Sequence, residues 1–206
     1  MLVLTAGAGA GFLFTGGAQA GFQLNLQADA KIADITVLET GPSYVLLKFQ
    51  MPEFTIVDSS SQEGTCQRVN LDWGAEAQNP GWPVVPVKGT MLAVPPQADP
   101  ALEIVESRMV TVEGRYDLCP AEDWQVGFWL DGQPRYRVNP GYRDPEAYSS
   151  NRFRPEDLVQ IAETGFIRDQ KVAQLRWQPF QYNPVEGRLR YFDSILIRVN
   201  FNGVGS

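Results

Sequence analysis

The alternation of apolar and polar residues between positions 171 and 201 constrains the fold of this chain more than any other feature. Two stretches place an apolar residue at every second position: Ala173, Leu175 and Trp177, then Ile195, Ile197, Val199 and Phe201. A period of two is typical of β-strands with one buried face. Between them, residues 181–187 contain Pro184 and Gly187, residue types that favour a tight turn. The pattern predicts a long β-hairpin over residues 171–201, whose apolar face needs a second layer to cover it.

Most of the remaining chain fits short strands separated by turns. Further strands are predicted in four segments: residues 35–38, 44–49, 54–57 and 102–112. Residues 58–64 are expected to form a polar loop and residues 117–155 an irregular region, while the best helix window is 154–163. Fifteen prolines and nineteen glycines favour many turns. We therefore expect an all-β fold, an antiparallel, jelly-roll-like β-sandwich with long loops and little helix, as a single domain over residues 28–206.

The composition excludes several functions. The sequence has no histidine, so it holds neither a Ser-His-Asp nor a Cys-His catalytic set, nor a histidine-ligated zinc site. With a net charge of −7 and no basic stripe, nucleic-acid binding is not expected. Acidic residues near positions 117–123 and 144–146 lack EF-hand spacing, and we interpret them as solvated loops rather than a calcium site. No catalytic residue, metal or cofactor is predicted.

The two cysteines, Cys66 and Cys119, lie in turn-rich sequence and belong to no Cys-x-x-Cys motif. A cysteine pair in a secreted β-protein is typically a structural disulfide, and two separately buried thiols are the alternative. Closing a loop of this length would stabilise the fold by roughly 4 kcal/mol in the chain-entropy model.

Residues 1–27 have two interpretations. Residues 1–20 are apolar and end in Ala18-Gln-Ala20, which resembles a signal-peptide cleavage site, although a basic amino-terminal region is missing. The apolar run is too short and too rich in glycine for a membrane-spanning helix, so no span is expected in the mature protein. Period-two spacing of its large apolar residues also fits an extended assembly strand that adds to a sheet, its own or a neighbour's.

Two proline-rich segments carry a family resemblance. They are residues 81–86 (GWPVVP), followed by Pro95-Pro96, and residues 179–184 (PFQYNP), before the last strand. Their order and spacing resemble the N-terminal propeptide of gingipain-type cysteine peptidases (peptidase family C25). Residues 142–148 (YRDPEAY) resemble, more loosely, the aromatic, acidic and proline-containing segment of that family. The resemblance covers residues 32–201.

The resemblance implies a secreted β-sandwich that acts as an intramolecular chaperone and blocks its peptidase until it is cut away. The catalytic residues of such enzymes lie in a separate downstream domain, so this chain is expected to be non-catalytic. Family propeptides inhibit by presenting a basic side chain, for which Arg135, Arg137 and Arg143 are candidates by location, because an arginine can bind a carboxylate with two hydrogen bonds. Alternatively, these arginines only form ion pairs within a solvated loop.

Two functions of different classes follow, both extracellular or at the cell surface. The first is a secreted inhibitor or chaperone whose partner is a cysteine peptidase domain, and a reading frame past Ser206 or a neighbouring gene that encodes such a domain would favour it. The second is a structural subunit of an extracellular filament or surface layer, assembled from copies of itself by N-terminal strand addition. Deleting residues 1–27 would then leave soluble monomers. A carbohydrate-binding module that stacks tryptophans on sugars is a third possibility.

Overall fold

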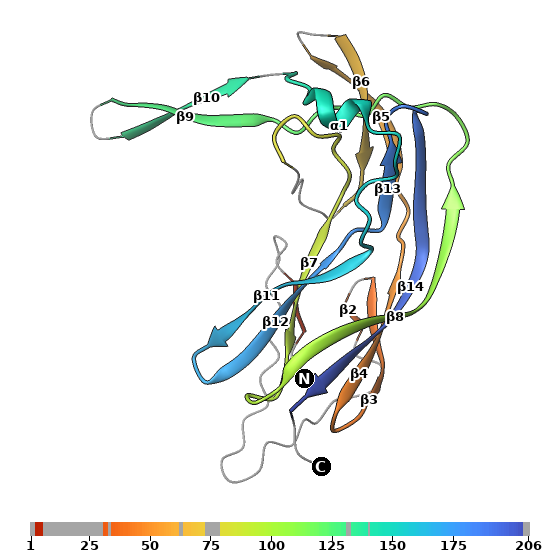
Figure 1. Ribbon diagram of the computed structural model, residues 1–206, viewed down its shortest axis with the longest axis vertical. Helices are drawn as coiled ribbons and strands as arrows, with labels where there is room; N and C mark the ends of the chain where they lie inside the picture. The colour runs from red at the N-terminus through yellow and green to blue at the C-terminus, as the bar shows by residue number, and fades with distance from the viewer. Residues whose placement is uncertain are drawn as a thin grey trace.

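Two antiparallel β-sheets form the body of the protein (Figure 1). The computed structural model describes residues 3–5, 31–32, 34–61, 64–72, 79–130, 133–139 and 141–203. It describes the side chains of these residues except at positions 3–5, 31–32, 61, 123–130 and 133–139. The predicted all-β fold class is confirmed, since α1 (Pro145–Ser149) is the only α-helix in the described part of the chain.

The first sheet has four strands in the order β1-β7-β12-β11. Their bounds are β1 (Val3–Thr5), β7 (Lys88–Ala93), β12 (Gln170–Trp177) and β11 (Val159–Ile167). The middle strands β7 and β12 are rich in buried side chains, whereas most of β11 is exposed. An edge strand with one free side is the expected place for such exposure.

The second sheet is organised around the longest strand, β14 (Arg188–Asn202). One side of β14 pairs with β13 and β4, and β8 also pairs with it over most of its length. The sheet continues from β4 through β3 to β2. The bounds are β13 (Phe180–Asn183), β4 (Tyr44–Gln50), β8 (Asp99–Thr111), β3 (Ile35–Thr40) and β2 (Lys31–Ile32).

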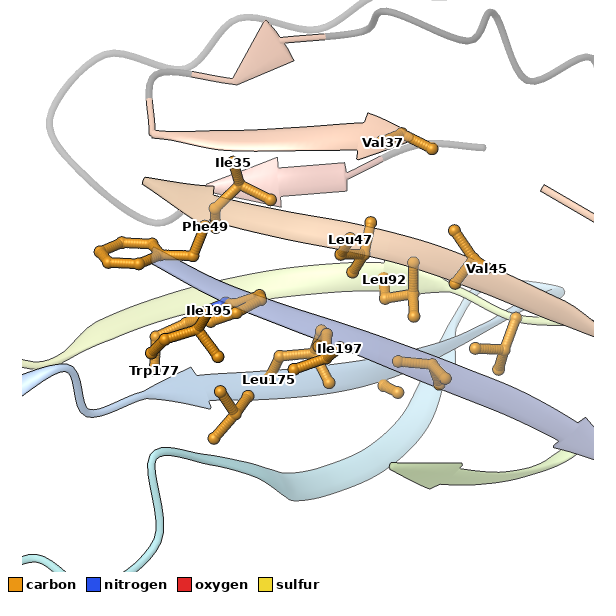
Figure 2. Packing of buried hydrophobic residues seen from close by; sticks show 14 of the residues in the cluster. Ile35, Val37, Val45, Leu47, Phe49, Leu92, Leu175, Trp177, Ile195 and Ile197 are labelled. Atoms are coloured by element: carbon orange, nitrogen blue, oxygen red, sulfur yellow. The ribbon is translucent and has the colours of Figure 1, made fainter. Parts of the chain in front are cut away.

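The core lies between these two sheets, and side chains from both point into it (Figure 2). Phe49 of β4 stacks on Trp177 of β12, with ring centroids 5.7 Å apart. The buried indole of Trp177 donates its N–H to the hydroxyl of Thr90 at 2.9 Å. A second cluster, centred on Phe180 and Leu118, extends the core toward the end of the molecule that carries α1. Burial of the alternating apolar residues therefore holds the two layers together.

The predicted hairpin over residues 171–201 is wrong in its pairing, although both of its strands exist. β12 pairs with β7 and β11, whereas β14 pairs with strands of the other sheet. Gln178 and Pro179 connect β12 to β13 and so carry the chain from one layer to the other. The two apolar faces meet across the core, and a period of two does not distinguish this arrangement from adjacent pairing. The hairpin that forms is β13–β14, and Gly187 has a φ of +63° in its turn.

Three local predictions also differ from the structure. The helix window 154–163 is wrong, because its second half begins β11, whose residues pair with β12. The polar segment 58–64 belongs largely to a hairpin of β5 (Thr55–Ser61) and β6 (Gly64–Asn70). The region 117–155 is not irregular throughout, because it contains α1 and the hairpin of β9 (Asp123–Leu130) and β10 (Gln133–Asn139).

Only a small part of the N-terminal segment lies in the described residues. Val3–Thr5 forms β1, which pairs antiparallel with β7 of the same chain. The rest of residues 1–27 lies outside the described part, so their cleavage and the domain start at residue 28 stay predictions. Within the described residues, no helix has the length and apolar character needed to cross a membrane.

Candidate functional site

The hairpin β9–β10 is the most prominent projection of the molecule. Figure 1 shows it extending to one side of the sandwich, and within the described part of the chain its two strands pair only with each other. Arg135 and Arg137 occupy alternate positions of β10. The chain enters the hairpin through residues 117–121, here called the incoming leg, and leaves through residues 142–148, the outgoing leg. The contacts of these two legs determine how firmly the projection is held.

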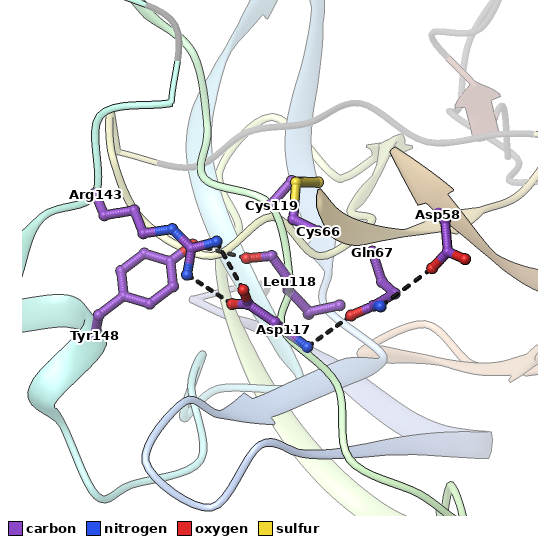
Figure 3. The surroundings of a disulfide bond; sticks show 8 residues. All are labelled: Asp58, Cys66, Gln67, Asp117, Leu118, Cys119, Arg143 and Tyr148. Carbon is purple, nitrogen blue, oxygen red and sulfur yellow. Dashed lines mark hydrogen bonds and ion pairs between the residues drawn. A yellow bond between two sulfur atoms is a disulfide. The ribbon is translucent and has the colours of Figure 1, made fainter. Parts of the chain in front are cut away.

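The incoming leg is bonded to β6. The sulfur atoms of Cys66 and Cys119 form a disulfide, as predicted, and both residues are buried (Figure 3). The backbone N–H of Gln67 donates to the carbonyl of Asp117 at 2.7 Å, and the N–H of Cys119 donates to the carbonyl of Gln67 at 2.9 Å. One covalent bond and two backbone hydrogen bonds therefore connect this leg to a β-strand.

Gly81 and Trp82, from the first proline-rich segment, contact both legs. The N–H of Gly81 donates to the carbonyl of Ala121 at 2.9 Å, and the N–H of Ala121 donates to the carbonyl of Trp82 at 2.7 Å. On the outgoing leg, the N–H of Asp144 donates to the carbonyl of Gly81 at 3.0 Å. Gly81 has a φ of +80°, and a Cβ atom there would lie 2.7 Å from the ring of Tyr142. This position therefore requires glycine on two independent grounds.

The two legs are also bonded to each other. The guanidinium of Arg143 donates two hydrogen bonds to the carboxylate of Asp117, at 2.6 and 2.9 Å. The same guanidinium lies 4.7 Å from the ring centroid of Tyr148, whose hydroxyl donates to the carbonyl of Leu118 at 2.8 Å (Figure 3). The side-chain carbonyl of Gln67 accepts the N–H of Asp117 and extends this network to β6.

The electrostatics of the network follow from these contacts. Hydrogen bonds to Asp117 raise the pKa of Arg143, and burial raises the pKa of Tyr148 above its usual value. Arg143 is therefore charged and Tyr148 neutral at any physiological pH, which is the state in which Arg143 donates to Asp117 and Tyr148 donates to Leu118.

Helix α1 is a short, capped helix within the outgoing leg. Asp144 is its N-cap and accepts the N–H of Ala147 at 2.9 Å, while Pro145 occupies the first turn, where its missing N–H costs nothing. The cap fixes the direction of the chain directly after Arg143. The acidic Asp-Pro-Glu segment thus begins a helix within the outgoing leg.

The second proline-rich segment secures the chain beyond α1. The side-chain amide of Gln181 donates to the carbonyls of Pro155 and Glu156, at 2.7 and 3.1 Å. The amide of Asn183 donates to the side-chain oxygen of Asn151 at 2.9 Å. Both residues are almost fully buried, so the loop satisfies polar groups that would otherwise be costly to bury.

Tyr182 connects this loop to Tyr116, the residue directly before the incoming leg. Its backbone exchanges two hydrogen bonds with Arg154, each 2.9 Å long. Its hydroxyl donates to the carbonyl of Tyr116 at 2.7 Å, and burial raises its pKa. The two segments that carry the family resemblance therefore both act as supports of the β9–β10 hairpin.

The structure separates the three predicted arginines. Arg135 and Arg137 lie on the hairpin itself, whereas Arg143 lies at its base in an ion pair with Asp117. For Arg143, the ion pair matches the alternative in which an arginine forms an ion pair within a loop. The inhibitory role of any of the three stays a prediction.

Two of the acidic loop residues form hydrogen bonds within the protein. Asp117 accepts both hydrogen bonds from Arg143, and Asp144 caps α1. In the part of the chain that the structure describes, no three acidic or cysteine side chains are grouped closely enough to hold a metal ion.

The sequence contains a signal for this hairpin that our interpretation missed. Asp131-Gly132 separates the two strands, and an Asp-Gly pair between β-prone segments favours a two-residue hairpin loop. No comparable sequence pattern predicts the contact between Tyr148 and Arg143, which are five residues apart.

Comparison with known proteins identifies the family. The family model Propeptide_C25 matches residues 26–205. This chain belongs to the C25 peptidase propeptide family. Gingipain R1 of Porphyromonas gingivalis is 23% identical over 168 residues, which are 81% of this chain and 16% of that protein. Lys-gingipain of the same species is 25% identical over 156 residues, 75% of this chain and 9% of that protein. The chain thus spans a small part of these relatives.

Two solved structures share the fold. A complex of the pro- and mature domains of Porphyromonas gingivalis RgpB matches with a TM-score of 0.68 and 20% identity, over 83% of this chain and 86% of that chain. A structure concerned with the zymogenic latency of gingipain K matches with a TM-score of 0.67 and 22% identity, over 82% and 92% of the two chains. None of these comparisons supports the filament alternative.

Proposed function

We propose that this chain is a non-catalytic propeptide that inhibits a cysteine peptidase and assists its folding, with the β9–β10 hairpin as the segment that enters the active-site cleft. The observation that carries the proposal is the hairpin itself, a projection that pairs with no other described strand and is bonded at both legs. Membership of the C25 propeptide family supports a cysteine peptidase as the partner. We also propose that the chain is exported from the cell.

The bonding at the base of the hairpin suits an inhibitor. A segment that must become ordered on binding loses conformational entropy, and this loss weakens the complex. The disulfide, the ion pair of Arg143 with Asp117 and the hydrogen bonds of Gly81 oppose such movement before the partner arrives. A hairpin fixed at its base therefore binds more tightly than a free loop of the same sequence.

We assign the inhibitory basic side chain to Arg135 or Arg137. Both belong to the projecting strand β10, and an arginine that enters a pocket with a carboxylate at its base can donate two hydrogen bonds. Arg143 already donates its two hydrogen bonds to Asp117, so we assign it to the support of the hairpin.

The non-catalytic assignment agrees with the side chains present. The sequence contains no histidine, and its two cysteines are joined in a disulfide, which leaves no free thiol as a nucleophile. Peptidase activity would then reside entirely in the partner domain.

Titration of the full chain into a C25-type peptidase domain from the same organism tests the proposal. We expect stoichiometric inhibition, and Arg135→Ala or Arg137→Ala should raise the inhibition constant about a hundredfold, since it leaves a buried carboxylate unpaired. Arg188→Ala, which removes an exposed arginine from β14, is the matched control. Refolding yields of the peptidase domain with and without the chain test the folding role. Full peptidase activity at a molar excess of the chain would contradict the proposal.

A further inference from the structure

A cavity of about 290 Å³ lies beside the base of the hairpin. Three parts of the chain enclose it: the segment after Gly81, helix α1, and the loop that meets the β13–β14 turn. The lining includes Trp82, Val85, Glu146, Ala147, Arg154 and Tyr182.

The walls of the cavity are largely apolar. Pro83, Pro155 and Pro184 also line it, and together with Trp82 and Tyr182 they present rings and aliphatic carbon. The charged residues of the lining are Glu146 and Arg154, and Arg154 lies 3.3 Å from Glu156 in an ion pair. A charged ligand group would lose its hydration in such a site, whereas an apolar group would gain from entering it.

The size of the cavity limits what it can hold. Sites for drug-sized molecules and cofactors usually measure about 300–1,000 Å³, so this cavity is slightly smaller than that range. A single large side chain suits it better than a cofactor.

The cavity lies next to the residues that support the hairpin. The carbonyl of Trp82 accepts a hydrogen bond from the incoming leg, at Ala121, and Ala147 belongs to the helix that ends the outgoing leg. Trp82 and Ala147 therefore line the cavity and also belong to the segments that support the hairpin. A protein that covers the hairpin down to its base comes within reach of the cavity.

We propose that this cavity receives one apolar side chain, aromatic or long aliphatic, from the surface of the peptidase domain that binds the hairpin. This proposal rests on the proposed function and adds a second anchor to it. The hairpin supplies the group that blocks the active site, and the cavity supplies apolar burial at its base. Anchors of this kind, in which a large apolar side chain fills a pocket, dominate the affinity of many interfaces.

Filling or opening the cavity tests this proposal. Ala147→Leu places a larger side chain inside it, and Trp82→Ala removes one of its walls. Each variant of the full chain should bind the peptidase domain with a Kd about tenfold higher or more, the factor that corresponds to burial of one large apolar side chain. Ala101→Leu, the same substitution at an exposed alanine of β8, should leave the Kd unchanged.

A measurement on the unmodified protein covers the case in which a variant does not fold. Hydroxyl-radical footprinting of the wild-type complex should show protection of Trp82, whose side chain is half-buried in the free chain. Two results would overturn the cavity proposal alone, provided that the wild-type chain inhibits the peptidase. One is an unchanged Kd for a folded Ala147→Leu variant, and the other is an unprotected Trp82 in the complex. A wild-type chain that does not inhibit would overturn the proposed function and this proposal with it.

Discussion

Gly81 illustrates how one residue can fix the base of a long projection. It combines a φ of +80° with a tight approach to the ring of Tyr142 and to the backbone nitrogen of Asp144. A side chain at this position would both strain the backbone and displace the outgoing leg.

We expect Gly81→Ala to lower the free energy of unfolding by about 1–3 kcal/mol, since it forces a positive φ on alanine. Gly165→Ala is the matched control, because a Cβ atom at Gly165 would meet nothing within 4 Å and its φ is not in the positive region. Urea denaturation of the two variants gives the comparison. Equal unfolding free energies for both would contradict the argument.

The buried tyrosines predict a loss of stability in alkali. Burial raises the pKa of Tyr148 and Tyr182, which means that the folded state favours their neutral form. Their contribution to stability is fully present below the unfolded pKa of about 10 and is lost as the pH rises through the folded pKa.

The midpoint of thermal unfolding should therefore fall as the pH rises above about 10. Tyr148→Phe should show a weaker fall, because it removes one of the two ionising groups, while it loses the hydrogen bond to Leu118 at every pH. A scan of the midpoint from neutral pH upward, on both proteins, makes the test. Identical slopes in alkali would show that Tyr148 does not contribute.

Among the elements, the disulfide between β6 and the incoming leg carries the clearest energetic prediction. It closes a sequence separation of 53 residues. A double variant, Cys66→Ala with Cys119→Ala, should lose about 2–4 kcal/mol of unfolding free energy, because the unfolded chain regains entropy. Chemical denaturation of oxidised wild type and of the variant measures the difference. An unchanged free energy of unfolding would mean that the hydrogen bonds of Gln67 suffice alone.

Strands could be predicted from the sequence more reliably than their pairing. The alternation in β12 and β14 identified both strands, yet these strands lie in different sheets because Gln178 and Pro179 carry the chain across the core. Periodicity shows which face of a strand is buried. It does not show whether the second alternating strand lies beside the first in the same sheet or opposite it in the facing sheet, because both arrangements bury the same face.

The site was predictable in part. The proline-rich segments indicated the family, but their structural role depends on partners far apart in sequence, such as Gly81 with Ala121 and Gln181 with Pro155. Such contacts leave no local pattern. The Asp131-Gly132 pair is a local signal for the β9–β10 hairpin, and the many aromatic residues and arginines of this region obscured it.

At the scale of the whole molecule, the stability of the fold depends on the contact between the two sheets. Trp177 is completely buried, stacks on Phe49 and donates a hydrogen bond to Thr90. Trp177→Ala should cost about 3–5 kcal/mol, through lost burial and an unfilled cavity. Leu38→Ala, on an exposed residue of β3, should cost far less in the same denaturation experiment. Similar losses in both variants would place the core elsewhere.

The central claim is that the β9–β10 hairpin, fixed at its base, is the part of this chain that contacts a peptidase. Hydrogen–deuterium exchange of the full chain, alone and in complex with the C25-type peptidase domain, tests this most directly. We expect the backbone amides of residues 123–130 and 133–139 to gain protection in the complex. A formed complex in which those amides exchange as fast as in the free chain would contradict it.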